Sequence, residues 1–312
     1  MGENNKVDLF LDSGAYSAMS QGAEIDIQEY IKFIKEHEHL LNVYVNLDVI
    51  GDKIKGPGID SAEATLKNQK IMEEAGLNPM PVFHRGEPLE YLQHYVDNYD
   101  YIGLGMGRAI GNTDQLPLWL DTVFGNIICG GDGYPKVKVH GFGMTSLKLM
   151  LRYPWYSVDS TSWALTGGMG SIFVPRYKNG EWIYDENPWK VVVSSRSPKA
   201  AFDRTYIHNM PPRKKQIILD YIHSKGYELG ESEFKMVDAD YEPSVNERWA
   251  ANKSDIINGE RLIEVFTKPG ISNLYTKRDE LNIIYFQDLE DTFKTYPWPF
   301  TKPATTRQTK LI

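Results

Sequence analysis

The chain of 312 residues contains a single cysteine, Cys129. One cysteine can neither form an internal disulfide nor supply a cysteine-rich zinc site, so we expect a reducing compartment and no structural zinc. The sequence also lacks any stretch approaching the roughly 18 uninterrupted apolar residues of a membrane span. Residues 1–6 are polar, with no apolar signal-peptide core behind them. The sequence therefore predicts a soluble, unsecreted protein of the cytoplasm with no membrane partner.

Basic residues are in deficit along the chain. Lys and Arg number 34 against 42 Asp and Glu, which gives a formal net charge of -8. A polyanion would have to be bound by a local basic patch rather than by the whole surface, which weighs against nucleic acid as a partner. Hydrophobic residues make up 41% of the chain and charged residues 24%, so we expect one large domain or two small ones.

The first half of the chain alternates short apolar runs with stretches of helical period. We predict strands at residues 7–11, 43–47, 81–83, 101–104, 136–139 and 155–158, and helices at residues 27–37, 61–75, 88–98, 115–124 and 146–152. Each predicted strand ends in a cluster of Gly, Asp or His. Six such units in series favour an α/β fold of the (β/α)8 TIM-like barrel type, with a doubly wound parallel sheet as the alternative.

The second half of the chain has a different pattern. Two apolar runs, residues 172–175 and 181–184, flank Asn179-Gly180 and predict a β-hairpin. Residues 191–193 are predicted as a further barrel strand. Beyond residue 200 we expect an irregular Pro-rich tail at the end of the chain, preceded by helices at residues 213–225 and 245–266.

These elements are assigned to two domains. Residues 1–230 are predicted to form a catalytic barrel, with the hairpin insertion near residues 171–187. Residues 231–312 are predicted to form a helical or irregular C-terminal extension. No low-complexity segment and no sequence repeat of 20 to 50 residues is visible.

Polar residues follow each predicted strand of the first half, and the carboxyl ends of parallel barrel strands meet around one pocket. The residues expected there are Asp12, Asp48, His84, Gly103 to Gly107, His140 and Asp159. Asp12 and Asp159 are the candidate catalytic pair, because substitution at an anomeric carbon needs one carboxylate to attack C1 and a second to move the proton. The alternative for each carboxylate is a structural role as a helix cap.

The other pocket residues are less specific. Gly103 to Gly107 lack the downstream pattern of a nucleotide-binding loop, and they favour either backbone contact with a planar ligand or plain close packing. His84 and His140 have no metal-ligand spacing, so we expect hydrogen-bonding side chains, no metal and no cofactor. Cys129 is predicted to be a buried small residue rather than a nucleophile.

The order of these motifs resembles the tRNA-guanine transglycosylase superfamily. That family carries Asp-Ser-Gly-Gly-Phe/Tyr, an Asp at a strand end, a Gln-Gly-Gly turn, Gly-Gly-Leu-Ala-x-Gly, Met-Gly-x-Gly and a nucleophilic Asp. In the same order this chain shows Asp12-Ser13-Gly14-Ala15-Tyr16, Asp48, His84-Arg85-Gly86, Gly103-Leu104-Gly105-Met106-Gly107, His140-Gly141-Phe142-Gly143 and Asp159. Each motif is weak alone, but six in order are fairly specific. The resemblance covers about residues 7–165.

The resemblance implies roles for individual residues. Asp159 would be the nucleophile and Asp12 the general acid/base. Tyr16 would stack on the base, Asp48 would bind its guanidine-like edge, and backbone N–H groups of Gly103 to Gly105 would meet its carbonyl. The implied substrate-binding set is Ser13, Tyr16, Asp48, His84, Gly103, Leu104, Gly105, His140 and Gly141.

Departures from the family pattern redirect the expected substrate. His84 stands where the family has Gln, His140 stands where it has Met, and the Arg that follows the nucleophile in the tRNA enzymes has no counterpart in residues 161–166. The family's zinc subdomain, which supports tRNA binding, cannot form with one cysteine. The chain therefore resembles most the viral-type 7-deazaguanine DNA transglycosylases, which implies exchange of guanine in DNA for a 7-deazaguanine base, in the host cytoplasm if the protein is viral. A tRNA substrate is the second choice.

A basic cluster provides the expected DNA contacts. Its members are Arg196, Lys199, Arg204, Arg213, Lys214 and Lys215, with Tyr206 and Tyr221 as possible stacking partners for bases. The alternative is an ordinary solvated helix face. Arg108 stands where the bacterial tRNA enzymes carry a glutamate, which implies an incoming base with a neutral 7-substituent, such as 7-cyano-7-deazaguanine.

Two further functions stay open at this point. A retaining glycoside hydrolase would use the same pair of carboxylates, with Trp119, Trp155 and Trp163 as sugar platforms. A catalytically inactive barrel could hold DNA or a partner protein for another enzyme. The sequence leaves the oligomeric state undetermined.

Overall fold

The computed structural model describes residues 8–51, 57–106, 115–144, 146–196, 204–250 and 258–301. The chain divides into two compact units, one formed by residues 1–160 with 294–312 and the other by residues 161–293. This boundary lies earlier than the predicted division near residue 230. All of the predicted catalytic and substrate-binding residues belong to the first unit, whereas the predicted nucleic-acid-binding residues belong to the second.

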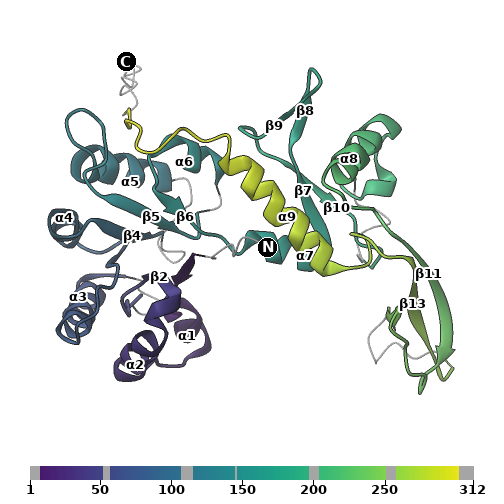
Figure 1. Ribbon diagram of the computed structural model, residues 1–312, viewed down its shortest axis with the longest axis horizontal. Coiled ribbons are helices and arrows are strands. Elements are labelled where there is room, and N and C mark those ends of the chain that lie inside the picture. Colours follow the sequence, from purple (N-terminus) through teal and green to yellow (C-terminus); the bar gives the residue numbers. More distant parts are fainter. Residues whose placement is uncertain are drawn as a thin grey trace, which may run out of the picture. The chain divides into compact units, whose positions relative to one another are not determined.

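The first unit is built on six parallel strands in sequence order (Figure 1). They are β1 (Leu9–Leu11), β2 (Leu41–Tyr44), β3 (Val82–His84), β4 (Tyr101–Gly105), β5 (Lys138–Phe142) and β6 (Ser157–Val158). β1 pairs with β2, β3 to β6 form one sheet, and a parallel bridge between Val45 and Met80 joins the two groups. The predicted alternation of parallel strands and helices is confirmed.

Helices connect these strands. They are α1 (Ala15–Gln21), α2 (Ile27–His37), α3 (Ile59–Glu74), α4 (Leu89–Asn98), α5 (Leu116–Val123) and α6 (Leu147–Arg152), with one-turn segments η1 (Glu38–Leu40) and η3 (Phe124–Ile128). Asp26 caps the start of α2, where its carboxylate accepts hydrogen bonds from the N–H groups of Gln28 and Glu29. The same helix buries Tyr30, Ile31 and Ile34 on one face.

The strands of the first unit curl. Phe10 of β1 stacks on His140 of β5 with ring centroids 4.5 Å apart, although β1 and β5 are not neighbours in the sheet. Only a curved sheet brings the inner faces of such distant strands into contact. Among the described residues no ladder closes β6 onto β1, so the parallel α/β class is confirmed and the closed (β/α)8 barrel stays a prediction.

The second unit is antiparallel in its strands. It begins with α7 (Ser162–Gly168), and β7 (Ser171–Val174) pairs antiparallel with β10 (Trp189–Val192). The predicted turn at Asn179-Gly180 is confirmed, with positive φ at both residues as a type I′ turn requires, and the second strand is β9 (Glu181–Ile183). The first strand is β8 (Arg176–Lys178) instead of the predicted residues 172–175, of which 172–174 belong to β7 and pair with β10. A strand, β10, overlaps the predicted residues 191–193, but it pairs antiparallel with β7 and is not the parallel barrel strand that was predicted.

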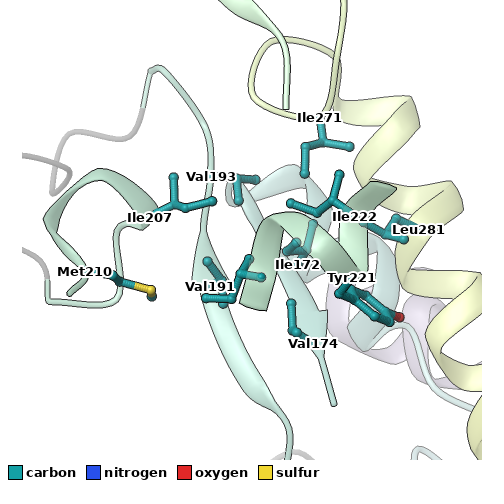
Figure 2. Packing of buried hydrophobic residues seen from close by; sticks show 11 residues of the cluster. Ile172, Val174, Val191, Val193, Ile207, Met210, Tyr221, Ile222, Ile271 and Leu281 are labelled. Atoms are coloured by element: carbon teal, nitrogen blue, oxygen red, sulfur yellow. The ribbon is translucent and has the colours of Figure 1, made fainter. Parts of the chain in front are cut away.

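A hydrophobic core joins this sheet to two helices (Figure 2). The helices are α8 (Pro212–Ser224), which confirms the predicted helix at residues 213–225, and α9 (Tyr275–Glu290). Ile172 and Val191 from the two strands, Ile222 from α8 and Leu281 from α9 are all fully buried. The one-turn segment η4 (Ile207–Asn209) adds Ile207 to the same cluster.

The predicted helix at residues 245–266 is wrong. The segment contributes β12 (Glu247–Trp249) and part of β13 (Glu260–Lys268). β13 lies between β12 and β11 (Glu231–Asp238) and pairs antiparallel with each of them. Asn258 and Gly259 adopt positive φ before β13, which interrupts any helix at that point. The described residues between 231 and 293 therefore form a three-stranded sheet followed by a helix.

The end of the chain returns to the first unit. The N–H of Phe300 donates to the carbonyl of Gly133 over 2.9 Å, and the Phe300 ring lies 5.2 Å from that of Tyr153. Trp298 is also buried. Residues 294–301 are irregular, as predicted for the Pro-rich tail, but they are packed.

Candidate active site

The polar residues predicted at one pocket are brought together at the carboxyl ends of the parallel strands. Asp12 follows β1, Asp48 lies beyond β2, His84 ends β3, His140 is in β5 and Asp159 follows β6. The charges of Asp48, Asp159 and His140 all act on the titration of Asp12, which places the group in one electrostatic environment. The predicted convergence of these side chains is therefore present in the fold.

Asp48 is the centre of a buried hydrogen-bonded group. The Ser13 hydroxyl donates to its Oδ1 over 2.5 Å, and Nε2 of His84 lies 2.8 Å from its Oδ2. Burial disfavours the charged form of His84, but the hydrogen bond and charge of Asp48 outweigh burial and raise the pKa of the imidazole. Each carboxylate oxygen can accept two hydrogen bonds, so Asp48 keeps capacity for a donor on a ligand.

Glu87 supports this group and was missed by the sequence analysis. Its Oε2 accepts the backbone N–H of His84 over 2.9 Å, and its Oε1 lies 3.3 Å from the Ser61 hydroxyl. Burial raises the pKa of Glu87 to about 7. Glu87 stands three residues after His84, which ends a strand, and this position was the sequence signal that could have identified it.

Asn46, two residues before Asp48, is a second buried polar residue that the sequence analysis missed. Its side chain is fully buried, and neither Nδ2 nor Oδ1 has a hydrogen-bond partner among the described residues. Buried amides in folded proteins are nearly always hydrogen-bonded, so an unpaired one at a strand end is unusual.

Asp12 is exposed at the strand ends, and its environment raises the pKa of its carboxyl group. The protein atoms around it partly desolvate the carboxyl group and raise its pKa, and the nearby carboxylates of Asp48 and Asp159 raise it further. The helix-cap alternative does not hold for Asp12. The N-cap of α1 is Gly14, with φ 75°, and no side chain caps the helix.

Asp159 has the opposite environment. Its Oδ1 accepts the backbone N–H of Gly143 over 2.5 Å and lies 3.7 Å from Nε2 of His140, while the side chain is 49% exposed. Desolvation raises its pKa, but His140 and the Gly143 N–H outweigh it, so the pKa of Asp159 is lowered. Its carboxylate does not cap α7, which has no side-chain cap.

Three glycines of the predicted substrate set are sites of close packing. A Cβ on Gly105 would overlap the His84 ring, and one on Gly103 would meet Phe142. At Gly141 it would crowd Trp155. The N–H of Gly103 already donates to the carbonyl of Pro81 over 2.8 Å. It is therefore not free to bind the carbonyl of a base, which was its predicted role.

Two other predicted contacts differ in access. Tyr16 is 49% exposed in the first turn of α1, where its ring is available to a planar ligand. The Leu104 side chain is fully buried, so its predicted contact with the base could be made by its backbone only. Gly107 and Arg108 lie outside the described residues.

The described part of the chain holds no group of three or more His, Cys, Asp or Glu side chains placed to bind a metal ion. Cys129 is buried, and burial raises the pKa of its thiol to about 11, which agrees with the prediction that it is not a nucleophile. No helix within the described ranges is long and apolar enough to cross a membrane.

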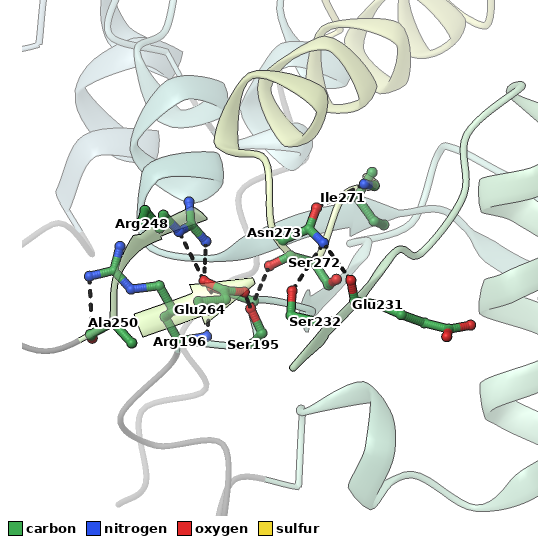
Figure 3. A network of polar contacts seen from close by, with 12 residues as sticks. Ser195, Arg196, Glu231, Ser232, Arg248, Ala250, Glu264, Ile271, Ser272 and Asn273 are labelled. Carbon is green, nitrogen blue, oxygen red and sulfur yellow. Dashed lines mark hydrogen bonds and ion pairs between the residues drawn. The ribbon is translucent and has the colours of Figure 1, made fainter. Parts of the chain in front are cut away.

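The basic cluster of the second unit is divided. Arg204 and Arg213 are exposed, and Lys214 and Lys215 lie in the first turn of α8. Arg196 instead donates to the carbonyl of Ala250 over 3.5 Å beside the Glu264 network (Figure 3). Lys199 lies outside the described residues.

The predicted stacking partners differ as well. Tyr221 is fully buried in the core of the second unit, so its prediction as a stacking side chain is wrong. Tyr206 is half-buried.

The sequence analysis missed Arg176 and Trp189 beside this cluster. Arg176 lies 5.2 Å and Lys214 5.0 Å from the Trp189 ring centroid. Burial and the charge of Arg176 lower the pKa of Lys214. Neither cation forms an ion pair with a described carboxylate, so an anion placed between them would relieve the repulsion.

Comparison of the chain with models of known protein families, with curated proteins and with solved structures finds no match. The assignment of function therefore depends on the geometry of the strand ends and on the motifs that they carry.

Proposed function

We propose that this protein is a base-exchange transglycosylase that replaces guanine in DNA with a 7-deazaguanine through a covalent aspartyl-glycosyl intermediate. Asp159 is the nucleophile and Asp12 the general acid/base in this proposal. The reaction needs no cofactor, because the energy of the broken glycosidic bond is retained in the ester and returned to the new bond.

The observation that carries the proposal is the opposite direction of two pKa shifts in one electrostatic environment. The pKa of Asp159 is lowered, which keeps it an anion able to attack carbon, and the pKa of Asp12 is raised, which favours a carboxylic acid able to donate a proton. Two carboxyl groups whose environments separate their pKa values are the signature of an acid and a nucleophile working together.

The proposed reaction has two displacements. In the first, an Asp159 oxygen forms a bond to C1′ of the deoxyribose as the bond from C1′ to N9 of guanine breaks, and the Asp12 acid gives its proton to the leaving base. In the second, the Asp12 carboxylate takes the N9 proton of the incoming 7-deazaguanine. N9 then bonds to C1′ and releases Asp159 as a carboxylate, with net retention of configuration.

The buried group around Asp48 supports recognition of the base. A guanine-type edge presents N–H donors to a carboxylate, and Asp48 retains lone pairs for them while Ser13 and His84 hold it in place. Tyr16 offers an exposed ring for stacking. A glycoside hydrolase is less well supported, because Trp155, one of its predicted sugar platforms, is buried and donates its indole N–H to the carbonyl of Leu149.

The second unit supports a nucleic-acid substrate. Its cations Arg176, Arg204, Arg213, Lys214 and Lys215 are exposed or half-buried and could meet phosphates, although the net charge of the chain is -8. C1′ of a stacked nucleotide is inaccessible to residues at strand ends, so the target nucleotide would have to be flipped or single-stranded.

The test is base exchange with a covalent trap. The protein is incubated with radiolabelled guanine and, separately, with DNA, tRNA or an oligosaccharide, and the label is followed into the polymer. A denaturing gel reports any protein–polymer adduct. We expect label and adduct with DNA only. Label in tRNA would redirect the substrate, cleavage of the oligosaccharide would favour the hydrolase, and no label in any polymer would refute the proposal.

A further inference from the structure

A chain of hydrogen bonds runs across three strands of the first unit and ends beside Asp159. The phenol oxygen of Tyr101 in β4 lies 2.5 Å from the Ser157 hydroxyl in β6, and that hydroxyl lies 2.6 Å from Nδ1 of His140 in β5. The register pairs His140 directly with Ser157. On the other side of the imidazole, Nε2 lies 3.7 Å from Oδ1 of Asp159.

The imidazole at the centre of this chain is enclosed. His140 is 3% exposed, Phe10 stacks on one side of its ring, and Phe142 meets it edge-on at 4.5 Å between centroids. Nε2 itself is buried and has no hydrogen-bond partner among the described residues. Among the described residues, the carboxylate that forms an ion pair within 4 Å of Nε2 is that of Asp159.

The chain has two possible proton directions, and electrostatics separates them. If Tyr101 donates to Ser157 and Ser157 donates to Nδ1, a neutral imidazole carries its proton on Nε2, facing Asp159. In the reverse direction Nε2 is a bare lone pair facing a carboxylate, and the two repel in a buried environment. Burial raises the pKa of Tyr101, so the phenol keeps its proton and can start the chain as a donor.

We propose that Tyr101, Ser157 and His140 form a positioning relay, which selects the tautomer protonated on Nε2 whenever the His140 imidazole is neutral and thereby orients the Asp159 carboxylate. The proposal rests on the proposed function only in naming Asp159 as the nucleophile. A distance of 3.7 Å is too long for a hydrogen bond, but such contacts often shorten when substrate binds.

The other groups around Asp159 set the background against which the relay acts. The charge of Asp159 raises the pKa of Asp12, at the end of β1, and the Gly143 N–H favours ionisation of Asp159. Asp48 and His84 lie in the same polar group and interact with Asp12. None of these four residues belongs to the relay, so removing a relay hydroxyl leaves them in place.

Spectroscopy tests the tautomer directly. The protein with its seven histidines labelled with ¹⁵N is titrated, and the His140 signals are identified by their loss in His140→Gln. We expect a protonated Nε2 and a bare Nδ1 in the neutral form of the wild type. Ser157→Ala should mix the two tautomers, and Ser157→Thr should restore the wild-type spectrum. A bare Nε2 in the wild type would overturn the relay.

Kinetics supply the second readout. Ser157→Ala should lower kcat for base exchange about threefold to tenfold, the usual effect of one buried hydrogen bond, with KM for the base unchanged. Tyr101→Phe removes a single oxygen and should act in the same direction, which covers the case in which Ser157→Ala does not fold. Tyr156→Phe is the matched control, because Tyr156 packs edge-on against Tyr101 but lies outside the chain.

The two readouts separate the two proposals. If the wild type exchanges bases but neither Ser157→Ala nor Tyr101→Phe changes kcat or the tautomer, the relay is wrong and the proposed function stands. If the wild type exchanges no base in any polymer, the proposed function is wrong, and the ¹⁵N spectra alone decide whether the relay exists.

Discussion

Two buried polar networks, one in each unit, differ in how fully their hydrogen bonds are made. In the second unit Glu264 is fully buried, and its two carboxylate oxygens accept hydrogen bonds from Ser195 and from Arg248, whose Nε lies 2.9 Å away (Figure 3). Asn273, also fully buried, donates to the carbonyl of Lys268 over 2.9 Å and accepts the N–H of Gly270 over 2.8 Å. This network has little capacity left for a ligand.

The strand ends of the first unit retain such capacity. Asn46 has no hydrogen-bond partner among the described residues, Nε2 of His140 has none there either, and Asp12 and Asp159 are perturbed in opposite directions. Satisfied buried networks hold a fold together, whereas unsatisfied and perturbed groups cluster where chemistry occurs. The difference assigns structure to one network and proposed catalysis to the other.

The largest effect that this difference predicts is at Asp159. Asp159→Asn should abolish base exchange and the covalent adduct, a loss of several orders of magnitude in rate, because an amide does not form the glycosyl ester. The measurement is exchange rate together with adduct on a denaturing gel. Exchange close to wild type, in a variant checked for deamidation, would remove the nucleophile assignment.

The next effect is at Asp12. Asp12→Asn should slow exchange roughly 10²-fold to 10⁴-fold, the range for a positioned acid/base, while the melting temperature stays within a few degrees. Rates are measured across pH, where loss of one limb of the profile is expected. An unchanged rate with a lowered melting temperature would make Asp12 structural, like the residues of the Glu264 network.

In the second unit the expected effect is on stability. Glu264→Ala should lower the free energy of unfolding by about 3–5 kcal/mol, because it leaves the Arg248 guanidinium without its buried partner. Denaturant unfolding measures the loss. The control is Glu231→Ala, which removes an exposed partner of Lys268 and should cost less than about 1 kcal/mol. Equal losses in the two variants would contradict the structural reading of the network.

A smaller effect is expected from pH in the first unit. The pKa of Glu87 is raised from 4.5 to about 7 in the fold, so the folded protein binds an extra proton between those values. Stability should therefore fall as pH rises from about 4.5 to 7, by up to about 3 kcal/mol. The raised pKa of His84 acts with the same sign, since its contribution is lost as pH rises through the folded value.

Thermal unfolding at pH 5 and pH 8 measures this dependence. Glu87→Gln should flatten it, because the amide oxygen can still accept the His84 N–H without a charge. Glu74→Gln, which changes an exposed carboxylate on α3, is the matched control and should leave the dependence as it is. A steeper dependence in Glu87→Gln would show that the sign is wrong.

The smallest effect is at the basic cluster. Arg213→Ala should weaken DNA binding a few-fold and reduce the slope of affinity against salt by about 1, the signature of one lost phosphate contact. Lys268→Ala is the control, because that cation is already paired with Glu231. Affinity is measured by fluorescence anisotropy at several salt concentrations, and an unchanged slope in Arg213→Ala would make the cluster a solvated face.

How far the sequence predicts this fold depends on the range of the contacts involved. The strands at residues 82–84 and 101–105 agree with prediction within a residue or two, because apolar runs and their polar ends are local patterns. The β12–β13 pairing was missed, although Asn258-Gly259, directly before β13, carries the same turn signal that located the hairpin at Asn179-Gly180.

The candidate site divides in the same way. Asp12, Asp48, His84 and Asp159 are visible in the sequence because each ends or follows a strand. His140 is visible because the predicted strand ends at residue 139, although β5 extends to Phe142. Ser157 and Tyr101 are not, because the contacts of Tyr101 with Ser157 and of Ser157 with His140 depend on the register of three strands, which pairs His140 with Ser157 across β5 and β6. The burial of Tyr221 likewise follows from packing against the second unit's sheet.

The return of the chain at Phe300 makes the second unit an insertion within the first. During synthesis, residues 8–160 leave the ribosome before the segment that covers Gly133 has been made, and 133 residues of the second unit come in between. The Tyr153 surface of the nascent first unit therefore stays uncovered for roughly ten seconds or more at ordinary rates of translation. If the chain were cut anywhere in the second unit, the Tyr153 surface and the Phe300 segment that covers it would belong to two separate polypeptides.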